Sequence, residues 1–439
     1  MIKVGMVSLG CPKNQVDAEM MLYTLKQAGF QIVSDENDAD AVIINTCGFI
    51  EDAKREAIEN ILEVAELKKS GLRALIVSGC LAERYGEDIV KEFPEVDAVV
   101  GIGENANIAK IVQSALSGTH KLFKGDKYDL DITAPRILST PKYSAYVKIA
   151  EGCDNCCTYC AIPSIRGRFR SRPIESVLSE IEDLARRGTK EIILVAQDTT
   201  RYGEDIYGVS KLPELIKAAA EIDGVQWIRT LYTYPERITD ELLEVIKSEP
   251  KAVRYLDIPI QHCNGEILKR MNRLGNRETL AALIKKIRGV MPDITLRTTL
   301  ITGFPGETEA QFEELCEFVN EMRFDNLGCF SYSEEEGTVA ATFPDKIDPQ
   351  LRSDRAEIIM NDQLRIVNEL NEAKIGKTFK VLVEGYDDYI KCYFGRAESA
   401  APDIDGKVFF MSEHPVDTGE FVNVKINDTI EYDLLGEAE

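Results

Sequence analysis

The sequence predicts an α/β protein in three parts: an N-terminal doubly wound parallel α/β domain, a central partial (β/α)6 barrel and a small C-terminal antiparallel β-barrel. Short apolar runs alternate with amphipathic helical patterns over the first 120 residues, and a second alternation begins at Ala145. Short strands separated by turns follow residue 375. A length of 439 residues accommodates about two to four domains. We expect domains at 1–120, 145–374 and 375–439, with a linker at 121–144.

The N-terminal domain is predicted from buried strands that alternate with helices. Apolar side chains between the strands recur at helical spacing, as at 58–65 and 108–115. Continuous apolar strands separated by such helices are typical of a mostly parallel sheet that is covered on both faces. The strand candidates are 2–8, 41–45 and 74–78, with a weaker fourth at 98–100.

Six strand–helix repeats are expected in the central domain. Helical patterns follow the strands, and the pattern at 308–322 opens with Thr308 and Gln311 in capping-box positions. Active sites of such barrels lie at the carboxyl ends of the strands, so we expect the functional residues there. The strand candidates are 145–149, 191–196, 227–232, 255–260, 295–302 and 327–332.

The C-terminal domain is predicted from five short strands that follow a long helical segment at 349–374. Their length and the turns between them are typical of a small β-barrel. The strand candidates are 378–384, 389–393, 408–411, 421–426 and 429–434.

The composition narrows the class of protein. Lys and Arg number 52 against 75 Asp and Glu, a net charge of −23, which argues against a large phosphate-binding surface and favours a basic partner. No apolar stretch approaches the ~18–20 residues that cross a bilayer, and the first residues lack the pattern of a signal peptide. We therefore expect a cytoplasmic protein whose eleven cysteines are reduced thiols.

The strongest chemical signal is a group of cysteines just after the first strand of the central domain. Cys153, Cys157 and Cys160 have the spacing CxxxCxxC. Three thiolates on one loop can hold three irons of a 4Fe–4S cluster and leave the fourth iron open for another ligand. A zinc site prefers four protein ligands, and no second cysteine pair completes one here. Cys156 offers an alternative CxxC pairing with Cys153, and we expect it not to be a ligand.

Three further cysteines, Cys11, Cys47 and Cys80, each come directly after a predicted strand of the N-terminal domain. The carboxyl ends of parallel strands line one crevice of a doubly wound sheet, so these thiols can converge there. Burial in the core is the alternative explanation for each of them.

The loop CxxxCxxC, with Tyr159 before its last cysteine, resembles the signature of the radical S-adenosylmethionine (SAM) enzymes. Together with the N-terminal cysteines and the C-terminal barrel, it resembles the methylthiotransferases, whose C-terminal barrel is called TRAM. The resemblance implies SAM and two 4Fe–4S clusters as cofactors, and replacement of a C–H bond by C–S–CH₃. By this resemblance the three later cysteines hold the cluster that generates the radical, and Cys11, Cys47 and Cys80 hold a cluster that delivers sulfur.

The resemblance also implies contacts with SAM beyond Tyr159. Gln197 and Asp198 follow the second strand, where the superfamily usually has Gly-Gly-Glu, and would hold the amino group of SAM. Arg297 on the fifth strand would meet its ribose or carboxylate, with an ordinary salt bridge as the alternative. Gly303 opens a glycine-containing loop suited to close approach of the cofactor, although a strand–helix turn explains the loop almost as well.

An arginine-rich segment, SIRGRFRSR at 164–172, follows the cluster loop. Its arginines could stabilise a reduced cluster or the carboxylate of SAM. Four solvated charges are the plain alternative.

The resemblance implies one of two substrates: an adenosine next to the transfer RNA anticodon, or an aspartate β-carbon in small-subunit ribosomal protein number twelve. The C-terminal barrel has six Lys and Arg against fourteen Asp and Glu, which disfavours RNA and favours the basic ribosomal protein. The motifs Cys11-Pro12-Lys13-Asn14, 196–200, 333–338 and 401–406 also resemble the ribosomal-protein branch.

We therefore expect a β-methylthioaspartate product, with methylthiolation of transfer RNA as the alternative and a non-enzymatic iron–sulfur carrier as a weaker one. The expected partners are a ribosomal protein or assembled small subunit, a reductant such as flavodoxin or ferredoxin, and a sulfur donor. Neither a membrane nor strong RNA binding is expected.

Overall fold

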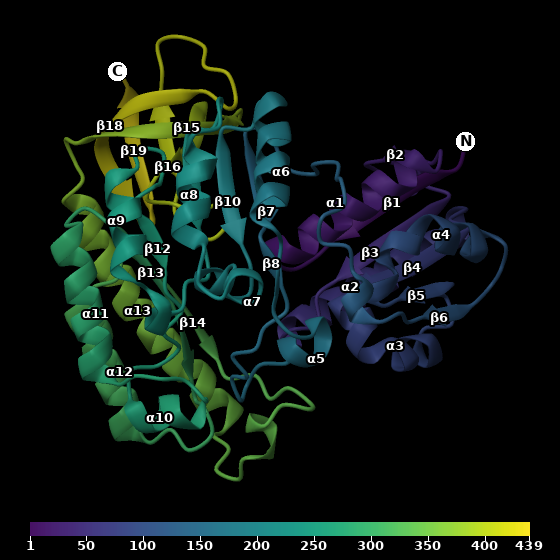
Figure 1. Cartoon of the computed structure of the whole chain (residues 1–439), viewed down its shortest axis with the longest axis horizontal. Helices are drawn as coiled ribbons and strands as arrows, with labels where there is room; N and C mark the ends of the chain where they lie inside the picture. Colours follow the sequence, from purple (N-terminus) through teal and green to yellow (C-terminus); the bar gives the residue numbers. More distant parts are fainter.

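The computed structural model describes all 439 residues and contains the three predicted parts. Figure 1 shows the N-terminal domain, coloured purple and blue, lying beside the central domain. The C-terminal barrel, in yellow, packs at one end of the central domain. The predicted fold class is confirmed.

The N-terminal domain is built on a six-stranded sheet in the order β2-β1-β3-β4-β5-β6, with every pairing parallel. Two of its strands were not expected: β2, and β6, which lies within the segment expected to be a linker. The strand order reverses next to β1, and such switch points are where doubly wound folds bind ligands. The strands are β1 (Lys3–Ser8), β2 (Gln31–Val33), β3 (Ala41–Thr46), β4 (Ala74–Gly79), β5 (Ala98–Val100) and β6 (Lys121–Phe123).

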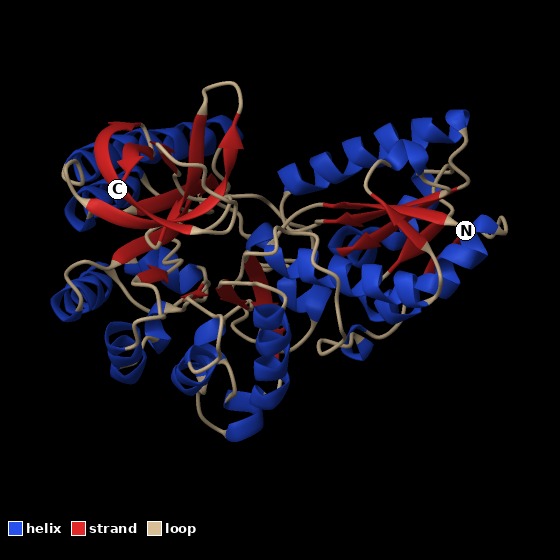
Figure 2. Cartoon of the chain, turned by 90° about the horizontal axis from the view of Figure 1, so that it is seen from above, coloured by secondary structure: helices blue, strands red, loops and turns tan.

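Helices cover both faces of this sheet (Figure 2). α1 and α4 pack on one face, where Met21 and Ile111 join a buried apolar cluster with strand residues. α2 and α3 pack on the other face through side chains such as Ile61 and Ile89. The helices are α1 (Pro12–Gln27), α2 (Glu51–Glu66), α3 (Cys80–Glu92) and α4 (Ile108–Leu116).

The central domain contains the six predicted strands, arranged as two three-stranded parallel sheets in the orders β11-β10-β7 and β12-β13-β14. A parallel bridge between Ile228 and Ala252 connects the two sheets. The strands are β7 (Ser144–Lys148), β10 (Glu191–Val195), β11 (Trp227–Thr230), β12 (Tyr255–Asp257), β13 (Thr295–Thr302) and β14 (Asn326–Ser331).

Long helices surround these strands, and α12 begins with the predicted capping box of Thr308 and Gln311. No helix in the structure combines the length and apolar character needed to cross a bilayer. The long helices are α6 (Ile174–Arg186), α8 (Leu212–Ala220), α9 (Asp240–Ser248), α11 (Arg277–Val290), α12 (Glu309–Met322) and α13 (Pro349–Glu372). The short elements are β8 (Ala150–Glu151), α5 (Ile162–Arg166), β9 (Arg170–Ser171), α7 (Glu204–Tyr207), α10 (Gly265–Arg270), η1 (Glu36–Asp38), η2 (Leu67–Ser70), η3 (Ile102–Asn107), η4 (Lys127–Asp129), η5 (Thr199–Arg201), η6 (Pro235–Arg237) and η7 (Ala340–Thr342).

The two faces of the central sheet have different partners. Side chains such as Val147 and Leu194 pack against the surrounding helices. Alternate residues of a strand point to the opposite face, where Tyr146 and Ile193 contact Val16 of α1 and side chains of the C-terminal barrel. The N-terminal domain is therefore packed against the inner face of the partial barrel of the central domain.

The C-terminal barrel closes in the order β15-β16-β17-β19-β18. Four of its pairings are antiparallel, and the pairing of β17 with β19 is parallel. The turn expected near residue 427 is a register shift between Ile426 and Asp428 within one long strand. The strands are β15 (Thr378–Asp387), β16 (Cys392–Ala397), β17 (Val408–Met411), β18 (Phe421–Ile430) and β19 (Asp433–Ala438).

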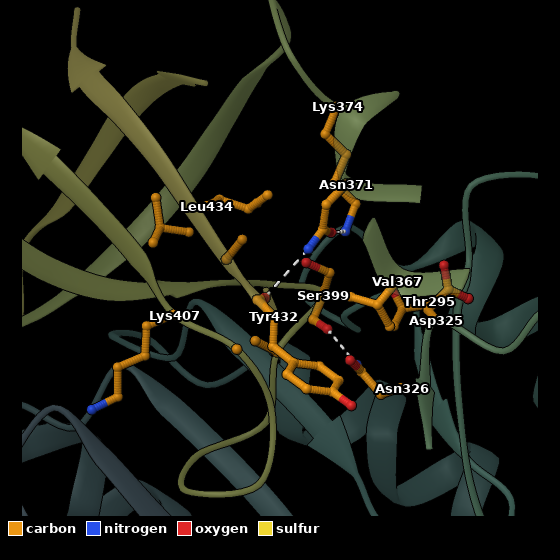
Figure 3. A pocket seen from close by; sticks show the side chains of 14 residues that line it. Thr295, Asp325, Asn326, Val367, Asn371, Lys374, Ser399, Lys407, Tyr432 and Leu434 are labelled. Carbon is orange, nitrogen blue, oxygen red and sulfur yellow. Dashed lines mark hydrogen bonds between the residues drawn. The ribbon is translucent and has the colours of Figure 1, made fainter. Parts of the chain in front are cut away.

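This barrel joins the central domain at the amino ends of the core strands. Figure 3 shows a pocket at the junction, where the side-chain amide of Asn371 donates to the carbonyl of Tyr432 (3.4 Å) and that of Asn326 donates to Ser399 (3.3 Å). None of the 14 residues that line the pocket is a cysteine, so it is separate from the predicted site.

A buried ion-pair network strengthens the same junction. Glu191, the first residue of β10, pairs with Arg229 of β11 (2.9 Å) and with Arg396 of β16 (2.6 Å). All three side chains are at most 1% exposed. Burial alone raises the pKa of Glu191, but the two guanidiniums outweigh it and lower that pKa to about 2.

We predict that Glu191→Gln destabilises the protein by about 3–5 kcal/mol, because it leaves two guanidiniums buried without a counter-charge. The pKa of about 2 lies below the ~4.3 of an unfolded glutamate. The stabilisation is therefore complete above about pH 5 and is lost as the pH falls toward 2. Denaturant unfolding followed by circular dichroism over a pH series measures both effects.

The matched control is Glu66→Gln, which breaks an exposed pair with Lys69 and should cost less than about 1 kcal/mol. Equal losses in the two variants would contradict the role of the network.

Candidate functional site

The three N-terminal cysteines lie at the carboxyl edge of the sheet, beside the switch point. Cys11 follows β1 and directly precedes α1, Cys47 follows β3, and Cys80 follows β4 as the first residue of α3. Cys47 and Cys80 are buried and Cys11 is half-buried. The structure therefore brings together three thiols that are far apart in the sequence.

Glycines allow these loops to approach one another. Gly10 has φ +89°, and a Cβ atom there would lie 2.6 Å from the Cβ of Cys47. A Cβ atom on Gly48 would lie 2.8 Å from the Cα of Leu81. Any larger residue would push the loops apart, since real Cβ contacts are not this short.

The thiols differ in how readily they lose a proton. Burial, together with the neighbouring Cys80 and Cys11, raises the pKa of Cys47 to about 12. Burial also raises the pKa of Cys80. Burial opposes ionisation of Cys11 as well, but the positive charges of Lys13 and Arg166 outweigh it and lower that pKa.

The second group of cysteines lies on the loop between β8 and α5. Cys153 and Cys157 are buried, Cys160 is half-buried and Cys156 is exposed. The backbone of Cys156 has φ +50° and its carbonyl accepts a hydrogen bond from Asn272 (3.0 Å). The hydroxyl of Tyr234 lies 3.3 Å from Cys157 Sγ. The exposure of Cys156 distinguishes it from the three thiols of the CxxxCxxC spacing.

The two groups of cysteines lie on opposite sides of one domain interface. Cys80 packs directly against Ala161 and Ile165, which follow Cys160 along the chain. Arg166, the last residue of α5, donates from Nη2 to Cys80 Sγ (3.4 Å). One interface thus contains both predicted triads.

Buried ion pairs fix this interface. Arg166 Nη1 donates to Asp17 of α1 (2.8 Å) and to Glu151 (3.0 Å). Lys148, at the end of β7, pairs with the same two carboxylates. All four side chains are at most 1% exposed. Arg166 is therefore not a solvated charge, and neither is Arg172, which is also buried.

A second clamp holds the loop after β14. Glu335 is 2% exposed and pairs with Arg84 of α3 (2.6 Å) and Lys54 of α2 (3.2 Å). Arg84 also donates to the carbonyl of Glu336 (2.7 Å). The segment 333–338, which was noted for its family resemblance, thus connects the two domains.

The donor set fits iron–sulfur clusters better than a single metal ion. No three His, Cys, Asp or Glu side chains converge closely enough to hold one ion. Each thiolate of a cuboidal cluster bonds a different iron, so its ligands are spread more widely than those of zinc. Buried and half-buried thiols at one interface suit such a group.

The predicted SAM contacts Tyr159, Gln197 and Asp198 differ in burial and in their hydrogen bonds. Tyr159 is half-buried near Cys157, and burial raises its pKa well above the usual value. Gln197 is half-buried. Asp198 is fully buried and accepts hydrogen bonds from Asn155 (2.9 Å) and Thr200 (2.5 Å). Since Asn155 belongs to the cysteine loop, Asp198 positions that loop.

Arg297 and Gly303 have structural partners. Arg297 pairs with Asp257 (3.2 Å) and with Asp405 of the C-terminal domain (3.4 Å), which is the salt-bridge alternative. Gly303 has φ +70°, and a Cβ atom there would lie 2.3 Å from the side chain of Arg352 on α13. This close approach to α13 accounts for the glycine without a cofactor.

Sequence reasoning missed other groups at the interface. Tyr232 and Tyr234 follow β11 at the carboxyl end of the core, and Arg273 lies 4.1 Å from the centre of the Tyr234 ring. Lys13 lies 3.5 Å from the centre of the Tyr232 ring. Tyr232 and Tyr234 could have been found from the sequence, because functional residues are expected just after the carboxyl ends of the core strands.

Comparison with known families divides the chain in the same order. Residues 3–101 match the uncharacterized protein family UPF0004, residues 147–319 the radical SAM superfamily, and residues 375–438 the TRAM domain.

Curated relatives match over the whole length. A protein of Desulforamulus reducens is 49% identical over 441 residues, covering 100% of this chain and 99% of the relative. One of Thermoanaerobacter sp. is 49% identical and covers 100% of both chains. One of Clostridioides difficile is 48% identical, covering 100% of this chain and 99% of the relative. Each is named ribosomal protein uS12 methylthiotransferase RimO.

Solved structures share the fold at low sequence identity. The radical SAM methyltransferase TsrM from Kitasatospora setae is 14% identical with a TM-score of 0.55, covering 75% of this chain and 73% of that chain. The cobalamin-dependent SAM radical enzyme OxsB is 14% identical with a TM-score of 0.51, covering 82% and 56%. The chain is a radical SAM transferase that uses SAM and a 4Fe–4S cluster, and it belongs to the RimO family of methylthiotransferases.

Proposed function

We propose that this protein transfers a methylthio group to the β-carbon of an aspartate in ribosomal protein uS12, giving β-methylthioaspartate. The observation that carries the proposal is the meeting of two triads of buried and half-buried cysteines at one interface, in a chain about 49% identical to relatives named for this activity. We further propose that the tasks divide among domains at 1–120, 145–374 and 375–439, with 121–144 as the connection.

Within this proposal Cys153, Cys157 and Cys160 hold a 4Fe–4S cluster with an open iron for SAM. When bound, this cluster supplies the electron that cleaves SAM and so makes hydrogen abstraction from an unactivated carbon possible. The proposed SAM contacts are Tyr159, which lies on this loop, and Gln197 and Asp198, which follow β10. Asp198 orients the loop through Asn155. Arg297 and Gly303 are further proposed contacts with SAM, but Arg297 already pairs with Asp257 and Gly303 already packs against Arg352.

Cys11, Cys47 and Cys80 would hold a second 4Fe–4S cluster, which would supply the sulfur. One SAM would supply the methyl group and another the radical. Arg166 connects the two cysteine groups, since it reaches Cys80 from α5, the helix that follows the loop of Cys153, Cys157 and Cys160. A reductant such as flavodoxin or ferredoxin and a sulfur donor complete the reaction.

The C-terminal barrel supports a basic protein as substrate. It has six Lys and Arg, of which Arg396 is buried, against fourteen Asp and Glu. An RNA-gripping module needs a positive face, whereas an acidic one attracts a basic protein and repels phosphates.

We predict that the six cysteines separate into two independent sets. Reconstituted protein should contain about eight irons in two clusters, and each cysteine variant should retain about four. Cys153→Ala should abolish 5′-deoxyadenosine formation, while Cys47→Ala should stop sulfur insertion and leave SAM cleavage intact. Iron analysis, electron paramagnetic resonance and chromatography of the products measure these effects.

Cys156→Ala is the control, because this thiol is exposed while Cys153 and Cys157 are buried and Cys160 is half-buried. It should keep all of the iron, and loss of half the iron would show that the ligands are assigned wrongly.

We predict that purified enzyme offered both substrates methylthiolates uS12 and leaves transfer RNA unmodified, as measured by mass spectrometry. Asp388, Glu413 and Asp417 are exposed acids of the C-terminal barrel. Replacing all three by Lys should slow modification of uS12 and weaken its dependence on salt, because screening acts over ~8–10 Å.

The matched control places three lysines at the exposed residues Glu56, Glu59 and Glu63 of α2, away from this barrel. SAM cleavage without substrate should be unchanged in both variants. A methylthio group on transfer RNA, with uS12 untouched, would overturn the proposed function.

A further inference from the structure

Lys13 is a buried cation at the interface of the two cysteine groups. It is the second residue of α1 and is 5% exposed. Its Nζ lies 3.5 Å from the centre of the Tyr232 ring, which belongs to the carboxyl end of the core. The side chain thus extends from the loop of Cys11 toward the mouth of the barrel.

The other buried cations of this interface have carboxylate partners. Lys148 and Arg166 share Asp17 and Glu151, and Arg84 pairs with Glu335. No carboxylate lies within ion-pair distance of Lys13, although the chain has 75 acidic residues. A buried ammonium whose neighbours are a tyrosine ring and the Cys11 thiol, with no carboxylate, has lost part of its hydration, and these groups replace it only in part.

The position within α1 adds to this cost. Lys13 lies in the first turn of a 16-residue helix that has no acidic residue in that turn. The amino end of a helix carries a partial positive charge, so a cation there is unfavourable and an anion is favourable. The Lys13 ammonium and the amino end of α1 together favour binding of an anion at this position.

Tyr232 has a strained backbone that hydrogen bonds hold in place. Its φ is +61°, a conformation that is rare for a bulky side chain and costs about 1–3 kcal/mol. Its N–H donates to Asp257 Oδ2 (3.0 Å), and its carbonyl accepts from the Thr199 N–H (3.1 Å). The ring that faces Lys13 therefore has a fixed position at the end of β11.

We propose that Lys13 binds the carboxylate of the substrate aspartate and so fixes its β-carbon between the two cysteine groups. This inference rests on the proposed function, because the reacting carbon of an aspartate is bonded to its carboxylate. An ammonium is a compact charge with three donors, so it can bind a carboxylate oxygen while staying beside the ring. An adenine base carries no charge for this residue to bind, so Lys13 also contributes to the choice of substrate.

The test measures the coupling between Lys13 and the charge of the substrate. Holoenzyme with both clusters is assayed with uS12 and with uS12 whose target aspartate is replaced by asparagine. The enzymes are wild type, Lys13→Met, Lys13→Arg and, as a control, Lys127→Met, whose half-buried side chain donates to the Ser164 carbonyl at the same interface. The readouts are the dissociation constant of each protein substrate, kcat/KM, iron content and the reduction potentials of the clusters.

Lys13→Met should lower kcat/KM for uS12 by about 10- to 100-fold, the range for loss of a hydrogen bond to a charged group. Wild type should bind the aspartate form more tightly than the asparagine form, and Lys13→Met should bind the two alike. Lys13→Arg should restore part of the preference for aspartate, while Lys127→Met should behave as wild type.

Two results would overturn the inference while the proposed function stands. In one, Lys13→Met keeps the wild-type preference for aspartate over asparagine. In the other, it loses iron or shifts a cluster potential with no change in that preference, so that Lys13 serves the cluster of Cys11 instead. If wild type does not modify uS12, the proposed function fails and this inference fails with it.

Discussion

The arrangement of the site depends on one buried network of four charges, formed by Asp17, Lys148, Glu151 and Arg166. Two positive and two negative side chains lie almost fully out of water, so removing any one leaves an uncompensated buried charge. The network joins α1 of the N-terminal domain to β7, the first strand of the core, and to α5, which follows the loop of Cys153, Cys157 and Cys160. It therefore fixes the distance between loops that carry both cysteine groups.

Buried ion pairs of this kind define geometry more than they add stability. Their attraction is largely offset by the loss of hydration, whereas a mismatched arrangement is strongly disfavoured. The apolar contacts of Val16 and Met20 with the inner face of the core supply the burial that holds α1 in place. Charge then selects one register of the docked helix. The two cysteine groups, which we propose act together, need this kind of definition.

Much of the fold could be predicted from the sequence because strands and helices here have clear periodicity. All six core strands were found, and the capping box of Thr308 was correct. The two missed strands, β2 and β6, are three-residue edge strands of the N-terminal sheet, too short to show a pattern. The convergence of Cys11, Cys47 and Cys80 followed from topology, since each lies after a parallel strand.

The partners of charged residues could not be predicted in the same way. Arg166 contacts Asp17, which is 149 residues away, and Arg297 contacts Asp405, which belongs to another domain. Such contacts depend on how domains dock, and no local spacing encodes them. The sequence therefore allowed either a functional or a solvated role for the arginines at 164–172. Only the docked structure shows that Arg166 and Arg172 are buried.

The position of the C-terminal barrel constrains what can be recognised. It contacts the amino ends of the core strands through Glu191 and through the packing of Phe421 on Trp227, while the cysteines lie at the carboxyl ends. The eight residues of β13 span ~26 Å at ~3.3 Å per residue. A partner that touches both the acidic barrel and the cysteine interface must therefore extend along the core. A small free metabolite cannot do so, whereas a folded basic protein can. The charge of the barrel acts on the encounter with that protein, and the chemistry is left to groups at the other end of the strands.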